Sequence, residues 1–263
     1  MKFVVIMVLM WSFLFGVEEI HPGILQGYLT AKEKPSSLAL LRPAPKSDSL
    51  EAKRDKEISD KLLTLQGTKR WALAREDANI YFPKAADIFS CALGINISKK
   101  ETPHLYTLLR RTLTDAGYST EEAKKAYKRE RPFMQNHKPI CTPEDEKILR
   151  QDGSYPSGHT ALGWAWALIL AEIAPQKADA ILARGMAYGE SRMVCNVHWQ
   201  SDVDAGRTMG SAIVAVLHAN SAFQKDLQQA KEEYQRAVFK GTPLKKDCSL
   251  ESQALQMSSD LLK

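Results

Sequence analysis

Two histidines and several cations stand in three short clusters in the central part of the chain. His159 follows Ser157 and Gly158, and His198 is followed four residues later by Asp202. A neutral imidazole can act as a nucleophile, while a second, protonated imidazole donates a proton to a leaving oxygen. Arginine and lysine side chains can stabilise the anion that reacts. The residue types therefore indicate phosphoryl transfer that needs no metal.

The segment Pro156-Ser157-Gly158-His159-Thr160 precedes an apolar run and is predicted to open a helix. Free N–H groups and a partial positive charge at a helix N-terminus attract anions. Gly158 lets the backbone approach an oxyanion closely, and the Ser157 hydroxyl can donate to a phosphoryl oxygen. His159 is placed to protonate a leaving oxygen. Taken alone, the segment also fits an ordinary serine N-cap beside an unrelated histidine.

Ser191 and Arg192 open another cluster, which continues to His198 and Asp202. Ser201 is predicted to cap a helix whose first turn contains Asp202. That carboxylate can accept a hydrogen bond from one ring nitrogen of His198 and leave the other nitrogen as a nucleophile. Arg192 offers a planar fork of donors for two phosphoryl oxygens. The alternative interpretation is a surface His–Asp pair near a helix start.

Lys124 and Arg131 make up the remaining cluster and are seven residues apart. Seven residues are about two turns of a helix, so we expect both side chains on one face of a helix that ends before Pro132. Lys128 and Arg129 lie between them and are interpreted as part of a solvated basic face. The functional assignment of this cluster depends on the other two.

The rest of the chain is predicted to be helical, because apolar residues recur at helical spacing and strand alternation is nearly absent. The run Ala161–Ala171 has eleven apolar or small residues, whereas a membrane span needs about 20, so it predicts a buried central helix. The fold class is a single-domain, all-α helical bundle. The expected helices span residues 49–66, 71–80, 85–93, 102–117, 119–131, 142–153, 158–173, 178–188, 201–217 and 221–239.

The chain divides into four predicted segments. Residues 1–16 have one lysine before a short apolar run, which is typical of a cleaved signal peptide and leaves no stable membrane insertion after cleavage. Residues 17–48 contain several prolines and no lasting periodicity, and they predict an extended N-terminal arm over the core. Residues 49–240 are expected to form the all-α catalytic domain, and residues 241–263 a loose C-terminal tail.

Charge and cysteine content narrow the class of protein. The net charge of +5 is spread along the chain, which weakly favours anionic substrates, and no nucleic-acid-binding signature is present. The four cysteines form no C-x-x-C pair, which argues against a zinc ribbon. In an exported chain they can form one or two disulfides, and all three pairings stay open. They are Cys91, Cys141, Cys195 and Cys248.

Together, the clusters resemble the signature of the acid phosphatase and vanadium haloperoxidase superfamily, K-x6-R-P, P-S-G-H and S-R-x5-H-x3-D. Every signature position is occupied: Lys124, Arg131, Pro132, Pro156, Ser157, Gly158, His159, Ser191, Arg192, His198 and Asp202. The wider surroundings, from Asp152 to Thr160 and from His198 to Arg207, are similar to the class A bacterial nonspecific acid phosphatases. This similarity runs from about Ser37 to Tyr234, which is most of the mature chain.

The resemblance implies an all-α fold with the site at the ends of a helical bundle. His198 is then expected to be the nucleophile that forms a phosphohistidine, His159 the general acid and later base, and Asp202 the residue that orients His198. No metal and no cofactor is expected, because cations and amides supply the electrostatic stabilisation. The residues expected to hold the phosphoryl oxygens are Lys124, Arg131, Ser157, Gly158 and Arg192.

The resemblance further implies a periplasmic or secreted phosphomonoesterase with broad specificity, able also to transfer phosphate between alcohols. The expected partners are small phosphorylated substrates, namely nucleotides, sugar phosphates and aryl phosphates, with no nucleic acid and no membrane. A homo-oligomer is compatible with the family, and the preferred substrate is left open.

Two other interpretations of the same residues stay open. One is a vanadate-dependent haloperoxidase in which His198 holds vanadate, and the other is a non-catalytic binder of phosphorylated ligands. Such a binder needs the cations but has no need of a second histidine beside a His–Asp pair. A lipid phosphatase of the same superfamily is disfavoured, because those enzymes usually have several membrane spans.

Overall fold

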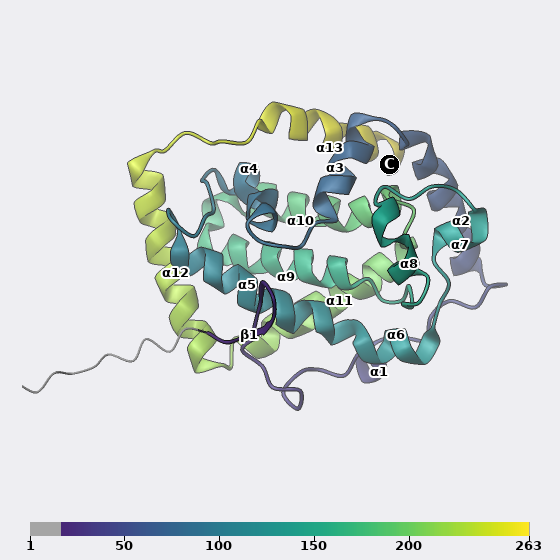
Figure 1. Ribbon diagram of the computed structural model, residues 1–263, viewed down its shortest axis with the longest axis horizontal. Helices are drawn as coiled ribbons and strands as arrows, with labels where there is room; N and C mark the ends of the chain where they lie inside the picture. Colours follow the sequence, from purple (N-terminus) through teal and green to yellow (C-terminus); the bar gives the residue numbers. More distant parts are fainter. Residues whose placement is uncertain (1–16, 263) are drawn as a thin grey trace, which may run out of the picture.

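The computed structural model describes residues 17–262 and shows helices packed around a central helix, α9, Gly158–Ile173 (Figure 1). Ten of its residues are buried, as the apolar run predicted. Its neighbours are α10 (Ala178–Val194), α11 (Gln200–Leu217) and α5 (Pro103–Gly117). The all-α fold class is confirmed.

Glycines let α10 and α11 approach α9 closely. A Cβ atom on Gly163 of α9 would lie 1.9 Å from Cδ1 of the Tyr188 ring, and one on Gly206 of α11 would lie 2.6 Å from the carbonyl oxygen of Ser157. Side chains larger than hydrogen therefore do not fit at these two contacts without movement of the helices. The close approach holds the first turn of α9 against α11, where the His–Asp cluster lies.

The remaining elements are mostly short. The only strands among the described residues, β1 and β2, pair antiparallel next to α5. The elements are β1 (Glu19–His21), β2 (Ile24–Leu25), α1 (Ser37–Leu40), α2 (Leu50–Leu62), α3 (Lys69–Asp77), α4 (Ser90–Leu93), α6 (Glu121–Tyr127), α7 (Pro132–Asn136), α8 (Glu146–Leu149), α12 (Ser221–Lys240) and α13 (Cys248–Leu262), with 3₁₀ turns η1 (Leu63–Leu65), η2 (Lys84–Phe89), η3 (Tyr118–Thr120), η4 (Pro143–Asp145) and η5 (Pro175–Lys177).

The expected helix over residues 119–131 ends early, so the prediction that Lys124 and Arg131 share one helix face is wrong. Helix α6 stops at Tyr127, and Lys128 takes a left-handed conformation with φ of 43°. Arg131 is extended, with φ of −81° and ψ of 155°, because a residue before proline avoids the helical region. The two cations reach the same region from two different segments.

Residues 17–48 run along the bundle with only β1, β2 and α1 as regular structure. The buried carboxylate of Asp115 on α5 anchors this stretch by accepting hydrogen bonds from the backbone N–H groups of Tyr28, at 2.7 Å, and Leu29, at 3.1 Å. The predicted signal peptide, residues 1–16, lies outside the described residues. Within the described part of the chain, no helix combines the length and the hydropathy that crossing a bilayer requires.

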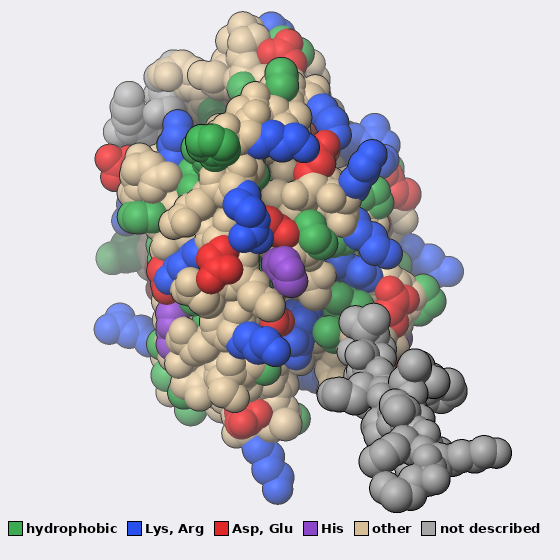
Figure 2. All heavy atoms as spheres, turned by 90° about the vertical axis from the view of Figure 1, so that its left-hand side faces the viewer, with side chains coloured by type: hydrophobic (Ala, Val, Ile, Leu, Met, Phe, Trp, Pro, Cys, Tyr) green, Lys and Arg blue, Asp and Glu red, His purple; other side chains and the backbone are tan. Residues whose placement is uncertain are grey.

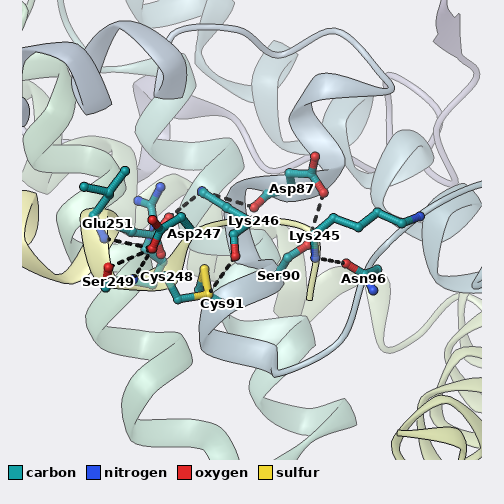
Figure 3. Close-up of a disulfide and its surroundings, with 12 residues drawn as sticks. Asp87, Ser90, Cys91, Asn96, Lys245, Lys246, Asp247, Cys248, Ser249 and Glu251 are labelled. Atoms are coloured by element: carbon teal, nitrogen blue, oxygen red, sulfur yellow. Dashed lines mark hydrogen bonds and ion pairs between the residues drawn. A yellow bond between two sulfur atoms is a disulfide. The ribbon is translucent and has the colours of Figure 1, made fainter. Parts of the chain in front are cut away.

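The C-terminal residues differ from the loose tail that we expected, because α13 forms there and packs near α2 and α3 (Figure 1). A disulfide joins its first residue, Cys248, to Cys91 of α4 (Figure 3). Glu251 of α13 pairs with Lys246 and lies 3.4 Å from Nε of Arg184 on α10. These contacts involve residues far apart in the sequence, so the local composition of the tail could not indicate them. The second disulfide joins Cys141 and Cys195, so the structure has one of the three pairings that the sequence left open.

Candidate active site

The three clusters meet at one cavity of about 450 Å³ beside the N-terminus of α9. A larger cavity of about 760 Å³ lies next to α3, but none of the predicted site residues lines it. We therefore assign the site to the smaller cavity. The predicted residues on its wall are Lys124, Arg131, Gly158, His159, Arg192 and His198.

The surroundings of His198 fix which ring nitrogen carries hydrogen. Its Nε2 lies 3.0 Å from Nη1 of Arg131, and a guanidinium can only donate, so Nε2 is the acceptor. The hydrogen is then on Nδ1, which lies 3.4 Å from Oδ2 of Asp202. The side chain is only 3% exposed. This tautomer leaves the Nε2 lone pair available as a nucleophile among the cations.

Asp202 is fully buried and lies behind His198. Its Oδ2 accepts hydrogen bonds from the backbone N–H of Trp199, at 2.8 Å, and from the hydroxyl of Ser154. Helix α11 begins at Gln200 with Trp199 as its N-cap, two residues before the Ser201 cap that we predicted. A carboxylate at the third helical position takes the free N–H of the cap residue, and this contact holds one of its two oxygens.

Lys124 and Arg131 share an acceptor in this structure. Nζ of Lys124 lies 2.8 Å and Nη2 of Arg131 lies 2.9 Å from Oδ2 of Asp152, which also lines the cavity. Both cations are buried, whereas the side chain of Asp152 is 41% exposed. Burial, and next the charge of Arg131, lower the pKa of Lys124. An exposed carboxylate is easier to displace than a buried one, so phosphoryl oxygens can compete for these donors.

Arg192 is the clearest indication of an anion site. Its side chain is buried, and its Nε and Nη1 have no hydrogen-bond acceptor among the described residues. Burial first, and the charge of nearby Arg131 to a lesser extent, lower the pKa of Arg192 to about 10. Leaving buried, charged donors unpaired costs several kcal/mol, on the order of 3 to 5. An anion that enters the cavity would supply the missing acceptors.

His159 projects from the first turn of α9, and its Nε2 lies 3.0 Å from the carbonyl oxygen of Ala78. A carbonyl only accepts, so Nε2 carries a hydrogen, and Nδ1 is the nitrogen that can gain or lose the second proton. Burial, and then the charge of Arg192, hold the pKa of His159 well below its usual range. His159 is therefore neutral when no anion is bound, and the protonated form that a general acid needs depends on the negative charge of a bound phosphoryl group.

Ser157 and Ser191 do not line the cavity. The Ser157 hydroxyl caps α9 by accepting from the backbone N–H of Thr160 at 3.2 Å. The Ser191 hydroxyl donates to a buried carboxylate, Asp77, at 2.6 Å and accepts from Nη1 of Arg70 at 2.9 Å. Ser191 therefore supports the helix that bears Arg192, and the donation of Ser157 to phosphate stays a prediction.

Sequence reasoning missed three residues that surround Asp202 or the cations, namely Arg129, Ser154 and Asp152. Arg129 was assigned to a solvated face, but its guanidinium is only 12% exposed and contacts Asp202 at 2.6 Å. That interpretation is wrong, because α6 ends before Arg129 and the following loop turns its side chain inward. The spacing of Arg129, Asp152 and Ser154 in the sequence has no helical or strand periodicity from which their role could have been predicted.

Without added phosphate, we expect the protein to lose stability as the pH falls below about 6.5, where imidazoles of an unfolded chain become protonated. Both His159 and His198 have folded-state pKa values below the ordinary value, chiefly because they are buried. The unfolded chain therefore binds more protons in this range. The stability that the neutral histidines contribute is complete above the unfolded pKa and is lost as the pH falls toward the folded pKa.

Thermal unfolding at pH 7 and pH 5, with and without saturating phosphate, measures this effect. A bound anion raises both pKa values, so phosphate should make the decrease in Tm on acidification smaller. Sodium chloride at the same ionic strength is the control. An equal decrease with phosphate and with chloride would contradict the assignment of the anion site to these histidines.

Comparisons with known proteins agree with one another. The sequence profile of the PAP2 superfamily matches residues 104–225, which contain all three clusters. A non-specific acid phosphatase of Providencia stuartii is 44% identical over 208 residues, covering 79% of this chain and 84% of that protein. A non-specific acid phosphatase of Salmonella typhimurium is 43% identical over 210 residues, covering 80% and 84%. An acid phosphatase of Zymomonas mobilis is 39% identical over 234 residues, covering 86% and 89%.

Proposed function

The chain belongs to the PAP2 superfamily and, within it, to the class A bacterial nonspecific acid phosphatases, and from this membership we propose that it hydrolyses phosphate monoesters through a phosphohistidine on His198. The observation that carries the proposal is that the two nitrogens of the His198 ring face groups of opposite charge. Nε2 of His198 is unprotonated and faces cations, while Nδ1 faces a buried carboxylate.

In the first step, phosphoryl oxygens are held by Lys124, Arg131 and Arg192. Nε2 of His198 forms a bond to phosphorus as the bond between phosphorus and the ester oxygen breaks. The imidazole gains positive charge in this step, and Asp202 stabilises it through Nδ1–H. The Gly158 N–H, at the start of α9, is placed to add a donor and a positive helix end.

His159 transfers the protons in both steps. It donates a proton to the leaving ester oxygen, so the alcohol departs neutral, and it then accepts a proton from the water that attacks the phosphohistidine. The N–P bond breaks, inorganic phosphate is released, and both histidines return to their starting state. An alcohol in place of water would give phosphate transfer by the same route, which we include in the proposal.

We further propose a periplasmic or secreted enzyme that acts on nucleotides, sugar phosphates and aryl phosphates, without a metal, with residues 49–240 as its catalytic domain. The signal-like residues 1–16 support export. Basic and acidic side chains are interspersed on the face shown in Figure 2, so that face shows no continuous basic surface of the kind that nucleic acid favours. Association into a homo-oligomer remains part of the family expectation.

The test is phosphate release from p-nitrophenyl phosphate, a nucleoside monophosphate and a sugar phosphate, each with and without EDTA. We expect release from all three substrates, with rates that EDTA leaves unchanged. Loss of activity in EDTA would overturn the metal-independent mechanism. Tight binding of these compounds without release would instead support a non-catalytic binder, and halide oxidation after loading with vanadate would support a haloperoxidase.

A further inference from the structure

Arg129 joins the carboxylate behind His198 to a second buried acid, Asp55 of α2. Its Nη1 donates to Oδ1 of Asp202 at 2.6 Å, and its Nη2 donates to Oδ2 of Asp55 at 2.7 Å. The arginine side chain is 12% exposed, and the acids are 0% and 3% exposed. Charge-assisted hydrogen bonds between buried partners fix geometry far better than surface ion pairs do.

Arg129 holds its place without touching the cavity. It is absent from the residues that line the 450 Å³ cavity, so it has no contact with a phosphoryl group there. Its backbone carbonyl accepts a hydrogen bond from the N–H of Ser154 at 2.8 Å, and the Ser154 hydroxyl donates to Oδ2 of Asp202. Arg129 and Ser154 are therefore joined through their backbones, and each binds a different oxygen of Asp202. The Arg129 side chain binds Oδ1, and the Ser154 hydroxyl binds Oδ2.

The two carboxylate oxygens of Asp202 make different contacts. Oδ2 faces Nδ1 of His198 at 3.4 Å, and Oδ1 is bound by Arg129. The torsion that rotates a carboxylate has a broad energy profile, so contacts on both oxygens are needed to hold one orientation. Without the guanidinium, Oδ1 loses a charged donor in a fully buried position, and the carboxylate can turn toward another donor.

Asp55 in turn holds Arg129 and the start of α11. Its Oδ1 accepts from the backbone N–H of Ser201 at 2.9 Å, and its Oδ2 accepts from the hydroxyl of Ser201 and from Arg129. An acid at a helix N-terminus is favoured by the helix dipole. The contacts thus run from Asp55 of α2 through Arg129 and Asp202 to the neutral ring of His198, and the charges of the first three residues alternate.

We propose that Arg129, held by Asp55, is a positioning residue that fixes the Asp202 carboxylate against His198. This inference rests on the proposed function, because it acts through the nucleophile. Its effect on His198 adds to that of the charged and titratable groups around the ring. These are Arg131 before α7, Lys124 of α6, Arg192 of α10, Asp202 of α11, His159 of α9 and Asp152 of the loop before α9.

The test is the pH dependence of Arg129→Met, which keeps most of the side-chain volume and removes the charge. We expect kcat to fall roughly 10- to 100-fold, as for the loss of other supporting contacts, with KM and the inhibition constant of phosphate unchanged. The acid limb of kcat/KM should move to higher pH, because the uncompensated Asp202 raises the pKa of His198. Arg129→Lys keeps the charge and should restore the limb and part of kcat.

A second variant, Asp55→Asn, should shift the acid limb of kcat/KM in the opposite direction. Asp55→Asn removes a negative charge from the far side of Arg129, so the acid limb should move to lower pH, with a smaller loss of kcat. This variant tests the inference if Arg129→Met fails to fold. The matched control is Lys128→Met, because Lys128 is the adjacent, exposed cation of the same loop.

The outcomes separate this inference from the proposed function. Unchanged kcat and an unchanged acid limb in Arg129→Met, beside an inactive His198→Ala, would overturn the role of Arg129 alone. A uniform loss of activity at every pH, not restored by Arg129→Lys, would show a structural role and would also overturn it. Full activity of His198→Ala would overturn the proposed function.

Discussion

Replacing His198 with alanine should lower phosphate release from p-nitrophenyl phosphate by at least about 10⁴-fold, an effect of the size seen when a nucleophile is removed from a covalent mechanism. The variant loses the only ring nitrogen that faces the cations and has a buried carboxylate behind it in the described structure. The measurement is the initial rate of p-nitrophenol production at several pH values.

The control for this prediction is the binding of phosphate to the variant. Lys124, Arg131 and Arg192 remain in place, so phosphate should still raise the Tm of His198→Ala. His104→Ala is the matched substitution, because His104 is exposed on α5 and outside the cavity, and it should keep full activity. Retained turnover in His198→Ala would end the phosphohistidine mechanism. In the wild-type protein, rapid mixing should give a burst of p-nitrophenol when hydrolysis of the intermediate is slow.

His159→Asn should show an effect that depends on the leaving group. General acid catalysis contributes typically about 10²- to 10⁴-fold, so kcat/KM for an alkyl phosphate such as a sugar phosphate should fall within that range. The p-nitrophenolate ion leaves without a proton, so kcat/KM for p-nitrophenyl phosphate should fall far less. Rates for both substrates, measured with one enzyme preparation, give the comparison.

The pH profile gives a second test of the role of His159. The pH profile of the wild-type kcat should be bell-shaped, because His198 must be neutral and His159 protonated in the reacting complex. His159→Asn should lose the alkaline limb for the alkyl phosphate and keep the acid limb. Equal losses for both substrates would contradict the role of His159 as the acid, and a wild-type profile that stays flat into strongly alkaline pH would contradict both roles.

The two disulfides and the Arg129 contacts show what could not be predicted. Asp55, Arg129 and Asp202 are far apart in the sequence. Nothing in the sequence distinguishes the largely buried Arg129 from the exposed Lys128 beside it. Ion-pair partners depend on where whole helices come to lie. The same holds for α13, which the bond between Cys91 and Cys248 joins to α4.

The amino-acid sequence by itself determined the all-α class, the buried helix α9 and the three clusters, because apolar periodicity, capping residues and short motifs act within a few turns of chain. Only the tertiary structure decided that Lys124 and Arg131 approach from separate segments and that Arg129 is buried behind Asp202. It also decided that two donor atoms of Arg192 have no acceptor within residues 17–262. The physical reason is that burial and charge pairing arise between segments distant in sequence, after close helix packing has brought them together.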